Sequence, residues 1–171
     1  MPRPYLLAEA HWPAPRDTPY EIAVLPWGAT EAHNYHLPYA TDVIECDHVA
    51  AEAARKAWDA GTRVAVLPTV PFGVNTTQLD IPLTLNVNPS TQLALLTDLA
   101  LALDGQGVRK LVLLNGHGGN HELNQLVVRD LALAQPADAP VTIAAASYWE
   151  IAAASLTADE RLGGFRMPGH A

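Results

Sequence analysis

The stretch Lys110-Leu111-Val112-Leu113-Leu114-Asn115-Gly116-His117-Gly118-Gly119-Asn120 decides how this chain folds. Four consecutive apolar residues after Lys110 are typical of a strand that is buried on both faces, since a half-exposed strand alternates apolar and polar side chains. The glycines that follow allow a sharp turn, because glycine adopts backbone conformations that other residues avoid. A helix is predicted next, at residues 121–134. The stretch therefore predicts a strand, a turn and a helix within a parallel sheet.

Short apolar runs and longer helical patterns alternate along the rest of the chain. The predicted strands are residues 22–25, 63–67 and 141–146, and the predicted helices are residues 43–60 and 91–103. Strands that alternate with helices are typical of a parallel sheet covered by helices on both faces. The sequence therefore predicts an α/β fold with three layers and a mostly parallel sheet, in a single domain over residues 1–171.

The predicted helices at residues 43–60 and 91–103 have residues at their ends that commonly cap helices. Thr41 or Asp42 is expected to cap the first helix and Ser90 the second, because their side-chain oxygens accept hydrogen bonds from free amide groups. Gly61 is expected to end the first helix. The helix at residues 91–103 is apolar on most of its circumference, which predicts cover on more than one side, for example by a second subunit.

Composition and charge exclude several classes of partner. The chain has 171 residues, 49% of them apolar, and a formal net charge of -8. Lys and Arg do not cluster, so we expect no binding to nucleic acid or to an anionic membrane surface. The single cysteine, Cys46, excludes an internal disulfide and is expected to pack on the apolar side of its helix. The absence of a signal-like start and of a membrane-spanning apolar run predicts a cytoplasmic protein.

Two loops that follow predicted strands contain side chains that bind metals. Ligands of open parallel sheets bind beyond the carboxyl ends of the strands. The first loop carries Glu31, His33 and Asp42, and the second carries His117 between glycines. Carboxylates and imidazoles suit Zn²⁺, Mn²⁺ or Fe²⁺, and a carboxylate can bridge two such ions. The pattern predicts a metal site, and the alternative is a pair of polar loops whose side chains only satisfy one another.

Two motifs in these loops carry a family resemblance. Glu31-x-His33, followed by His36-Leu37-Pro38 and Thr41-Asp42, precedes Asn115-Gly116-His117-Gly118-Gly119-Asn120. In order and spacing this pair resembles the creatininase family of metal-dependent amidohydrolases. The resemblance implies a creatininase-like α/β fold with two divalent ions and a bridging water as nucleophile. It also implies that Glu31 and His117 hold one ion, that His33 holds the other, and that Asp42 binds both.

Three further residues take expected roles from the resemblance. His36 falls at another family histidine and is expected to orient a ligand or contact substrate, the alternative being a hydrogen bond within its loop. Trp149 lies where the family places aromatic residues over the substrate, although a packing role is an equal alternative. His170 matches the family's catalytic histidine, which is proposed to carry a proton to the leaving nitrogen.

The sequence departs from the family pattern in two places. Gly119 occupies the position at which creatininase proper has a glutamate that completes the second ion's ligands. The chain also stops at Gly169-His170-Ala171, within a segment that carries a substitute glutamate in relatives. We therefore expect the sequence to lack the last part of the domain.

The leading functional hypothesis is a metal-dependent amidohydrolase. The expected reaction is hydrolysis of a C–N bond in a small cyclic amide, formamide or related substrate by metal-activated water, within a homo-oligomer. Gly119 favours formamides or other amides over creatinine itself. One alternative is a non-catalytic or incomplete metal-binding subunit of an oligomeric assembly. Another is a serine hydrolase with an oxyanion loop at His117-Gly118-Gly119, which the lack of a Gly-x-Ser-x-Gly motif disfavours.

Overall fold

A computed structural model of the chain describes residues 2–121, 124–125, 128–129 and 142–150. Its elements in chain order are η1 (Leu7–Glu9), α1 (Pro13–Asp17), β1 (Ile22–Trp27), α2 (Thr41–Asp59), β2 (Val64–Val66), α3 (Pro89–Gly105), β3 (Lys110–Asn115), η2 (Gly118–Asn120) and β4 (Thr142–Ser147). All four predicted strands are confirmed. The described residues between 121 and 129 are helical, as predicted, and the remainder of that helix lies outside the described residues.

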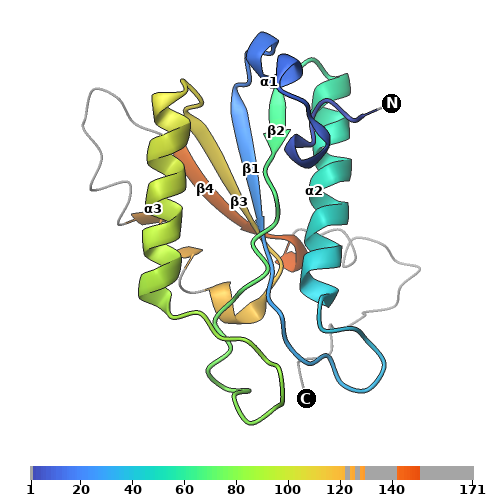
Figure 1. Cartoon of the computed structure of the whole chain (residues 1–171), viewed down its shortest axis with the longest axis vertical. Coiled ribbons are helices and arrows are strands. Elements are labelled where there is room, and N and C mark those ends of the chain that lie inside the picture. Colours follow the sequence, from blue (N-terminus) through green and yellow to red (C-terminus); the bar gives the residue numbers. More distant parts are fainter. Residues whose placement is uncertain (1, 122–123, 126–127, 130–141, 151–171) are drawn as a thin grey trace.

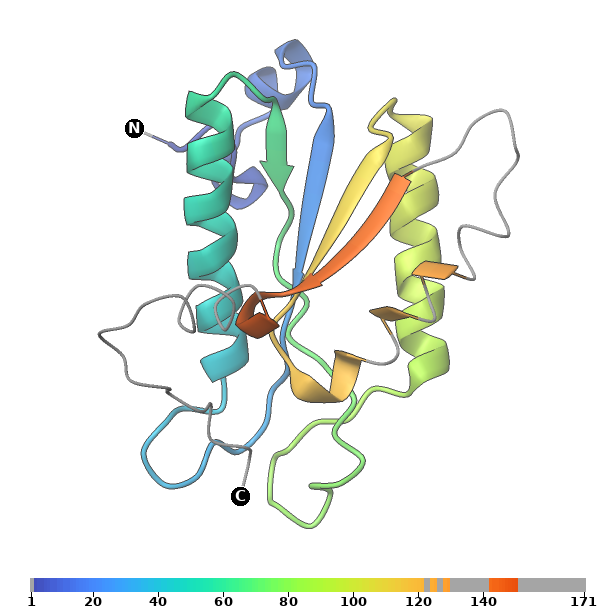
Figure 2. The same cartoon turned by 180° about the vertical axis from the view of Figure 1, so that it is seen from behind.

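The four strands form one parallel sheet in the order β2-β1-β3-β4. The register places Val24 of β1 beside Val66 of β2 and beside Val112 of β3. Because all four strands run in the same direction, their carboxyl ends lie at one edge of the sheet, which is the lower edge in Figure 1. The long connections after β1 and β2 also lie at this edge (Figures 1 and 2).

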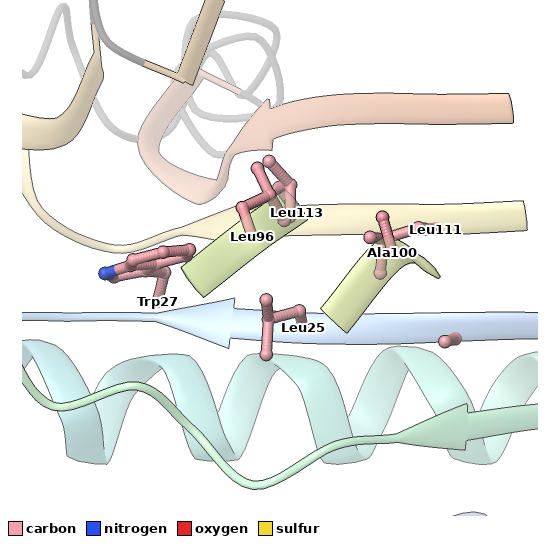
Figure 3. Packing of buried hydrophobic residues seen from close by; sticks show 7 residues of the cluster. Leu25, Trp27, Leu96, Ala100, Leu111 and Leu113 are labelled. Carbon is pink, nitrogen blue, oxygen red and sulfur yellow. The ribbon is translucent and has the colours of Figure 1, made fainter. Parts of the chain in front are cut away.

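One face of the sheet packs against α3. The buried cluster on this face comprises Ala23, Leu25, Trp27, Leu96, Ala100, Leu111 and Leu113. Figure 3 shows Leu25 and Trp27 on β1 and Leu113 on β3, with Leu96 reaching from α3 toward them. Burial of a leucine side chain stabilises the fold by roughly 1.5–3 kcal/mol, so this cluster holds α3 against the centre of the sheet.

The opposite face packs against α2. Ala50 and Ala54 of this helix contact Val64 and Val66 of β2 together with Leu114 of β3. Alternate residues of a strand point to opposite faces, so each central strand contributes to both clusters. The helices α2 and α3 therefore cover opposite faces, as Figures 1 and 2 show, and the predicted three-layer α/β fold is confirmed.

The predicted side-chain cap of α2 is wrong. Thr41 and Asp42 are the first two residues of the helix, which follows Ala40, and no cap hydrogen bond from a side chain occurs there in the described structure. The Thr41 hydroxyl donates instead to the Pro38 carbonyl at 2.6 Å. Gly61 follows the helix end with a φ of +98°, which explains why glycine stands at this position.

The cap predicted for α3 is also wrong, because the helix begins at Pro89 and places Ser90 inside its first turn. Proline suits this position since it lacks the amide that would otherwise be left unpaired. One face of α3 packs on the sheet, while Leu95 and Leu101 are 39% and 65% exposed. A second subunit over this exposed face stays a prediction.

Candidate metal centre

Four predicted ligands come together at the carboxyl edge of the sheet. Glu31 and His33 follow β1, Asp42 lies in the first turn of α2, and His117 lies between β3 and η2. Glu31, Asp42 and His117 are buried, and one ligand atom of each lies within 4.8 Å of the others. The His33 ring adjoins this group. The two loops therefore meet as the sequence predicts.

The two nitrogens of His117 have different partners. Nε2 lies 3.0 Å from the carbonyl oxygen of Val74, and it must donate this hydrogen bond because a carbonyl only accepts. Nδ1 lies 2.9 Å from both Glu31 Oε1 and Asp42 Oδ2. A neutral His117 consequently directs the lone pair of Nδ1 at two carboxylate oxygens.

His33 repeats this arrangement on the other side of Asp42. Its Nδ1 lies 3.3 Å from the main-chain carbonyl of Glu31, and its Nε2 lies 2.9 Å from Asp42 Oδ1. Each imidazole thus contacts a main-chain carbonyl through one nitrogen and Asp42 through the other. The two oxygens of Asp42 therefore face two different imidazoles.

The centre concentrates lone pairs and negative charge, and a cation relieves their repulsion. His117 Nδ1 lies 2.9 Å from Asp42 Oδ2 and from Glu31 Oε1, and it can donate a hydrogen bond to them only when it carries a proton. Burial lowers the pKa of His117, but the carboxylates of Asp42 and Glu31 outweigh burial and raise that pKa to about 10. Without metal the imidazole therefore binds a proton, and a divalent cation can take the place of this proton. The residues present fit a divalent cation.

Two glycines leave room for the His117 ring. A Cβ atom added at Gly73 would lie 2.6 Å from Cδ2 of that ring. A Cβ atom at Gly119 would lie 2.6 Å from its Nε2 and 2.0 Å from the Val74 carbonyl oxygen. Gly119 therefore has no space for a side chain in this structure.

The sequence reasoning missed the contribution of the long connection between β2 and α3. This connection brings the Val74 carbonyl to His117, and it also brings the Gln78 side chain to Glu31. A main-chain carbonyl leaves no signature in the residue type. The available signal was length, since loops beyond about 12–15 residues are commonly functional.

The remaining predicted residues lie at the same edge or outside the described residues. His36 is exposed in the loop after β1. Trp149 follows β4 and is half-buried, with ring centroids 5.4 Å from Tyr148 and 6.3 Å from His121. His170 lies outside the described residues. Cys46 is buried below the second loop, and this burial raises the pKa of its thiol to about 12, so its predicted packing role is confirmed.

Comparison with known proteins agrees with this geometry. Residues 8–171 match the family described as Creatininase, creatinine amidohydrolase. The chain belongs to the creatininase family. A creatinine amidohydrolase of Pseudomonas putida is 28% identical to this family member in an alignment 138 residues long, which covers 75% of this chain and 50% of that protein.

Solved structures of the creatininase family share the fold. A protein of Bacteroides fragilis described as a creatinine amidohydrolase is 40% identical, with a TM-score of 0.80, over 88% of this chain and 58% of that one. A crystal structure of a creatinine amidohydrolase (creatininase) is 26% identical, with a TM-score of 0.74, over 96% of this chain and 65% of that one. The chain thus spans about half the length of the curated relative and less than two thirds of these structures.

Proposed function

We propose that this chain provides the metal centre of an amidohydrolase that cleaves the C–N bond of a small amide. The observation that carries the proposal is the convergence of two imidazoles and two carboxylates whose lone pairs face one another at 2.9 Å. The proposed ligands are Glu31 and His117 for one cation, His33 for a second, and Asp42 for both. The two directions of the Asp42 oxygens support this assignment.

The proposed cations are two divalent ions of zinc, manganese or iron. Carboxylate and imidazole ligands serve these metals comparably, so the ligand types do not choose among them. Creatininases of this fold include a Zn-Zn type and a Mn form, which are 23% and 24% identical to this chain. Those likenesses concern the fold, and the metals of this chain remain our proposal.

The chemistry proposed for the centre needs both metal and protein groups. Bound divalent cations lower the pKa of water and polarise a carbonyl, which are the two requirements of amide hydrolysis near neutral pH. The main-chain carbonyls of Val74 and Glu31 each contact one ring nitrogen of His117 and His33, respectively, and the other nitrogen of each ring faces the carboxylates. Burial of Glu31, Asp42 and His117 excludes bulk water from these groups and strengthens their electrostatic interactions.

The proposed substrates are small cyclic amides, formamides or related compounds. Trp149 is proposed to contact the substrate because it follows β4 at the carboxyl edge, where the metal ligands also lie. His36 is proposed to contact substrate or a ligand from its exposed loop, and His170 is proposed to pass a proton to the leaving nitrogen.

A homo-oligomer is the proposed assembly. Within the described residues, no helix combines the length and apolar character needed to cross a membrane.

Metal binding by the purified 171-residue chain tests the proposal. Asp42→Ala removes the carboxylate that faces both imidazoles, and Asp59→Ala removes an exposed carboxylate at the other end of α2. We expect wild type and Asp59→Ala to retain zinc or manganese after dialysis and Asp42→Ala to lose it. Each loaded protein is then assayed with a panel of small amides for released amine or formate.

Two results contradict the proposal at different levels. If wild type and Asp42→Ala both retain negligible metal after dialysis, the proposed metal centre does not exist. Retained metal without hydrolysis of any amide in the panel would contradict the enzymatic function and favour a non-catalytic metal-binding subunit.

A further inference from the structure

Residues 73–78, here called the supporting segment, contact two of the proposed ligands at once. The Val74 carbonyl accepts a hydrogen bond from His117 Nε2 at 3.0 Å. The Gln78 side-chain amide donates from Nε2 to Glu31 Oε2 at 2.7 Å. The other oxygen of that carboxylate, Oε1, lies 2.9 Å from His117 Nδ1. The supporting segment therefore contacts His117 and Glu31 through Nε2 and Oε2, while their Nδ1 and Oε1 atoms face each other.

The backbone of the supporting segment is fixed independently of the Gln78 side chain. The Val74 amide donates to Asn120 Oδ1 at 3.1 Å, and this oxygen also accepts from Gln92 of α3 at 3.0 Å. The Asn75 amide donates to Asn86 Oδ1 at 2.8 Å. A change in the Gln78 side chain consequently leaves the Val74 carbonyl on His117.

A neutral amide has a specific effect on a carboxylate ligand. An amide N–H orients one carboxylate oxygen without neutralising the group, whereas Lys or Arg would offset the charge that attracts a cation. Hydrogen bonds of this kind around a metal site fix the direction of the ligand and commonly change metal affinity by about 10- to 100-fold.

We propose that Gln78 is a positioning residue that holds the Glu31 carboxylate with Oε2 on the amide and Oε1 directed at the cation. This inference rests on the metal centre proposed above. The role acts through Glu31, because Gln78 itself supplies no ligand atom. Gln78 is half-buried in a loop and belongs to neither core cluster, so its replacement is expected to leave both clusters intact.

Metal affinity of side-chain variants tests the role of Gln78. Gln78→Met keeps nearly the same length and volume without an N–H, and Gln78→Asn keeps an amide that is one methylene too short. Thr77→Ala is the matched control, since Thr77 is the exposed neighbour in the same segment. Zinc affinity is measured by competition with a chromophoric chelator, and the cobalt(II)-loaded proteins are compared by visible absorption. Thermal unfolding in a chelator checks the metal-free fold.

We expect both Gln78 variants to bind zinc about 10- to 100-fold more weakly than wild type and to show an altered cobalt spectrum. Thr77→Ala is expected to match wild type, and unfolding of all metal-free proteins should remain cooperative. Wild-type affinity and spectrum in Gln78→Met would overturn the proposal, as would an equal loss in Thr77→Ala. Failure of the metal centre itself is recognised separately, because wild type would then bind no zinc.

Discussion

Replacement of Gly119 by alanine tests whether close packing shapes the metal centre. An added Cβ would lie 2.0 Å from the Val74 carbonyl oxygen, and a shift of about 1 Å is needed to bring this contact to 3.0 Å. The shift separates Val74 from His117, whose pKa of about 10 means that the ring is charged at neutral pH in the metal-free protein. The substitution therefore adds strain and removes a charged hydrogen bond.

Both effects contribute to the expected loss of stability. Inserting a methyl group into a packed site costs roughly 1–3 kcal/mol. A hydrogen bond to a charged group contributes about 1.5–3 kcal/mol. Together they predict that Gly119→Ala lowers the free energy of unfolding by about 4 kcal/mol, or the Tm by roughly 8–16 °C for a domain of this size.

Thermal and urea unfolding in a chelator measure this loss, with Gly105→Ala as the matched control. Apart from its chain neighbours and the backbone of its own helix, no described atom lies within 4 Å of a Cβ added at Gly105, the last residue of α3. The control is expected to gain up to about 1 kcal/mol, because alanine favours the helix. The reasoning is refuted if Gly119→Ala unfolds like wild type.

Gly119→Glu is expected to add no metal ligand, because the same close contacts leave no space for a side chain at this position. A rise in zinc affinity would contradict this expectation.

Two further predictions concern pH and the buried thiol. Because the metal-free fold raises the pKa of His117 to about 10, its stabilising contribution is complete below the unfolded-state value of about 6.5 and is lost as pH rises through 10. In a chelator, the Tm of wild type should therefore fall between pH 6.5 and pH 10 more steeply than the Tm of His117→Gln. Zinc should stabilise wild type increasingly over the same range. Parallel Tm curves for the two proteins in chelator would contradict the raised pKa of His117. Cys46 is fully buried with a thiol pKa of about 12, so a thiol reagent should label it only in denaturant, and rapid labelling of the native protein would show that the second loop opens.

Local sequence patterns predicted the secondary structure well because they reflect burial directly. The apolar run at Leu111 to Leu114 is buried between two helical layers, and its strand lies at the centre of the sheet. The capping predictions failed for different reasons: α3 begins one residue before Ser90, the Thr41 hydroxyl bonds the nearby Pro38 carbonyl, and tertiary contacts engage the Asp42 side chain. Asp42 faces two imidazoles instead of the helix amides.

The order of residues by itself determined the α/β class, the positions of the strands and the pair of loops that carry Glu31, His33, Asp42 and His117. These features follow from hydrophobic periodicity and from the rule that parallel strands end at a common edge. Only the tertiary structure decided which atoms of those side chains face one another. The Val74 carbonyl and the Gln78 amide come from a distant connection, and their hydrogen bonds depend on chain packing that no local pattern encodes.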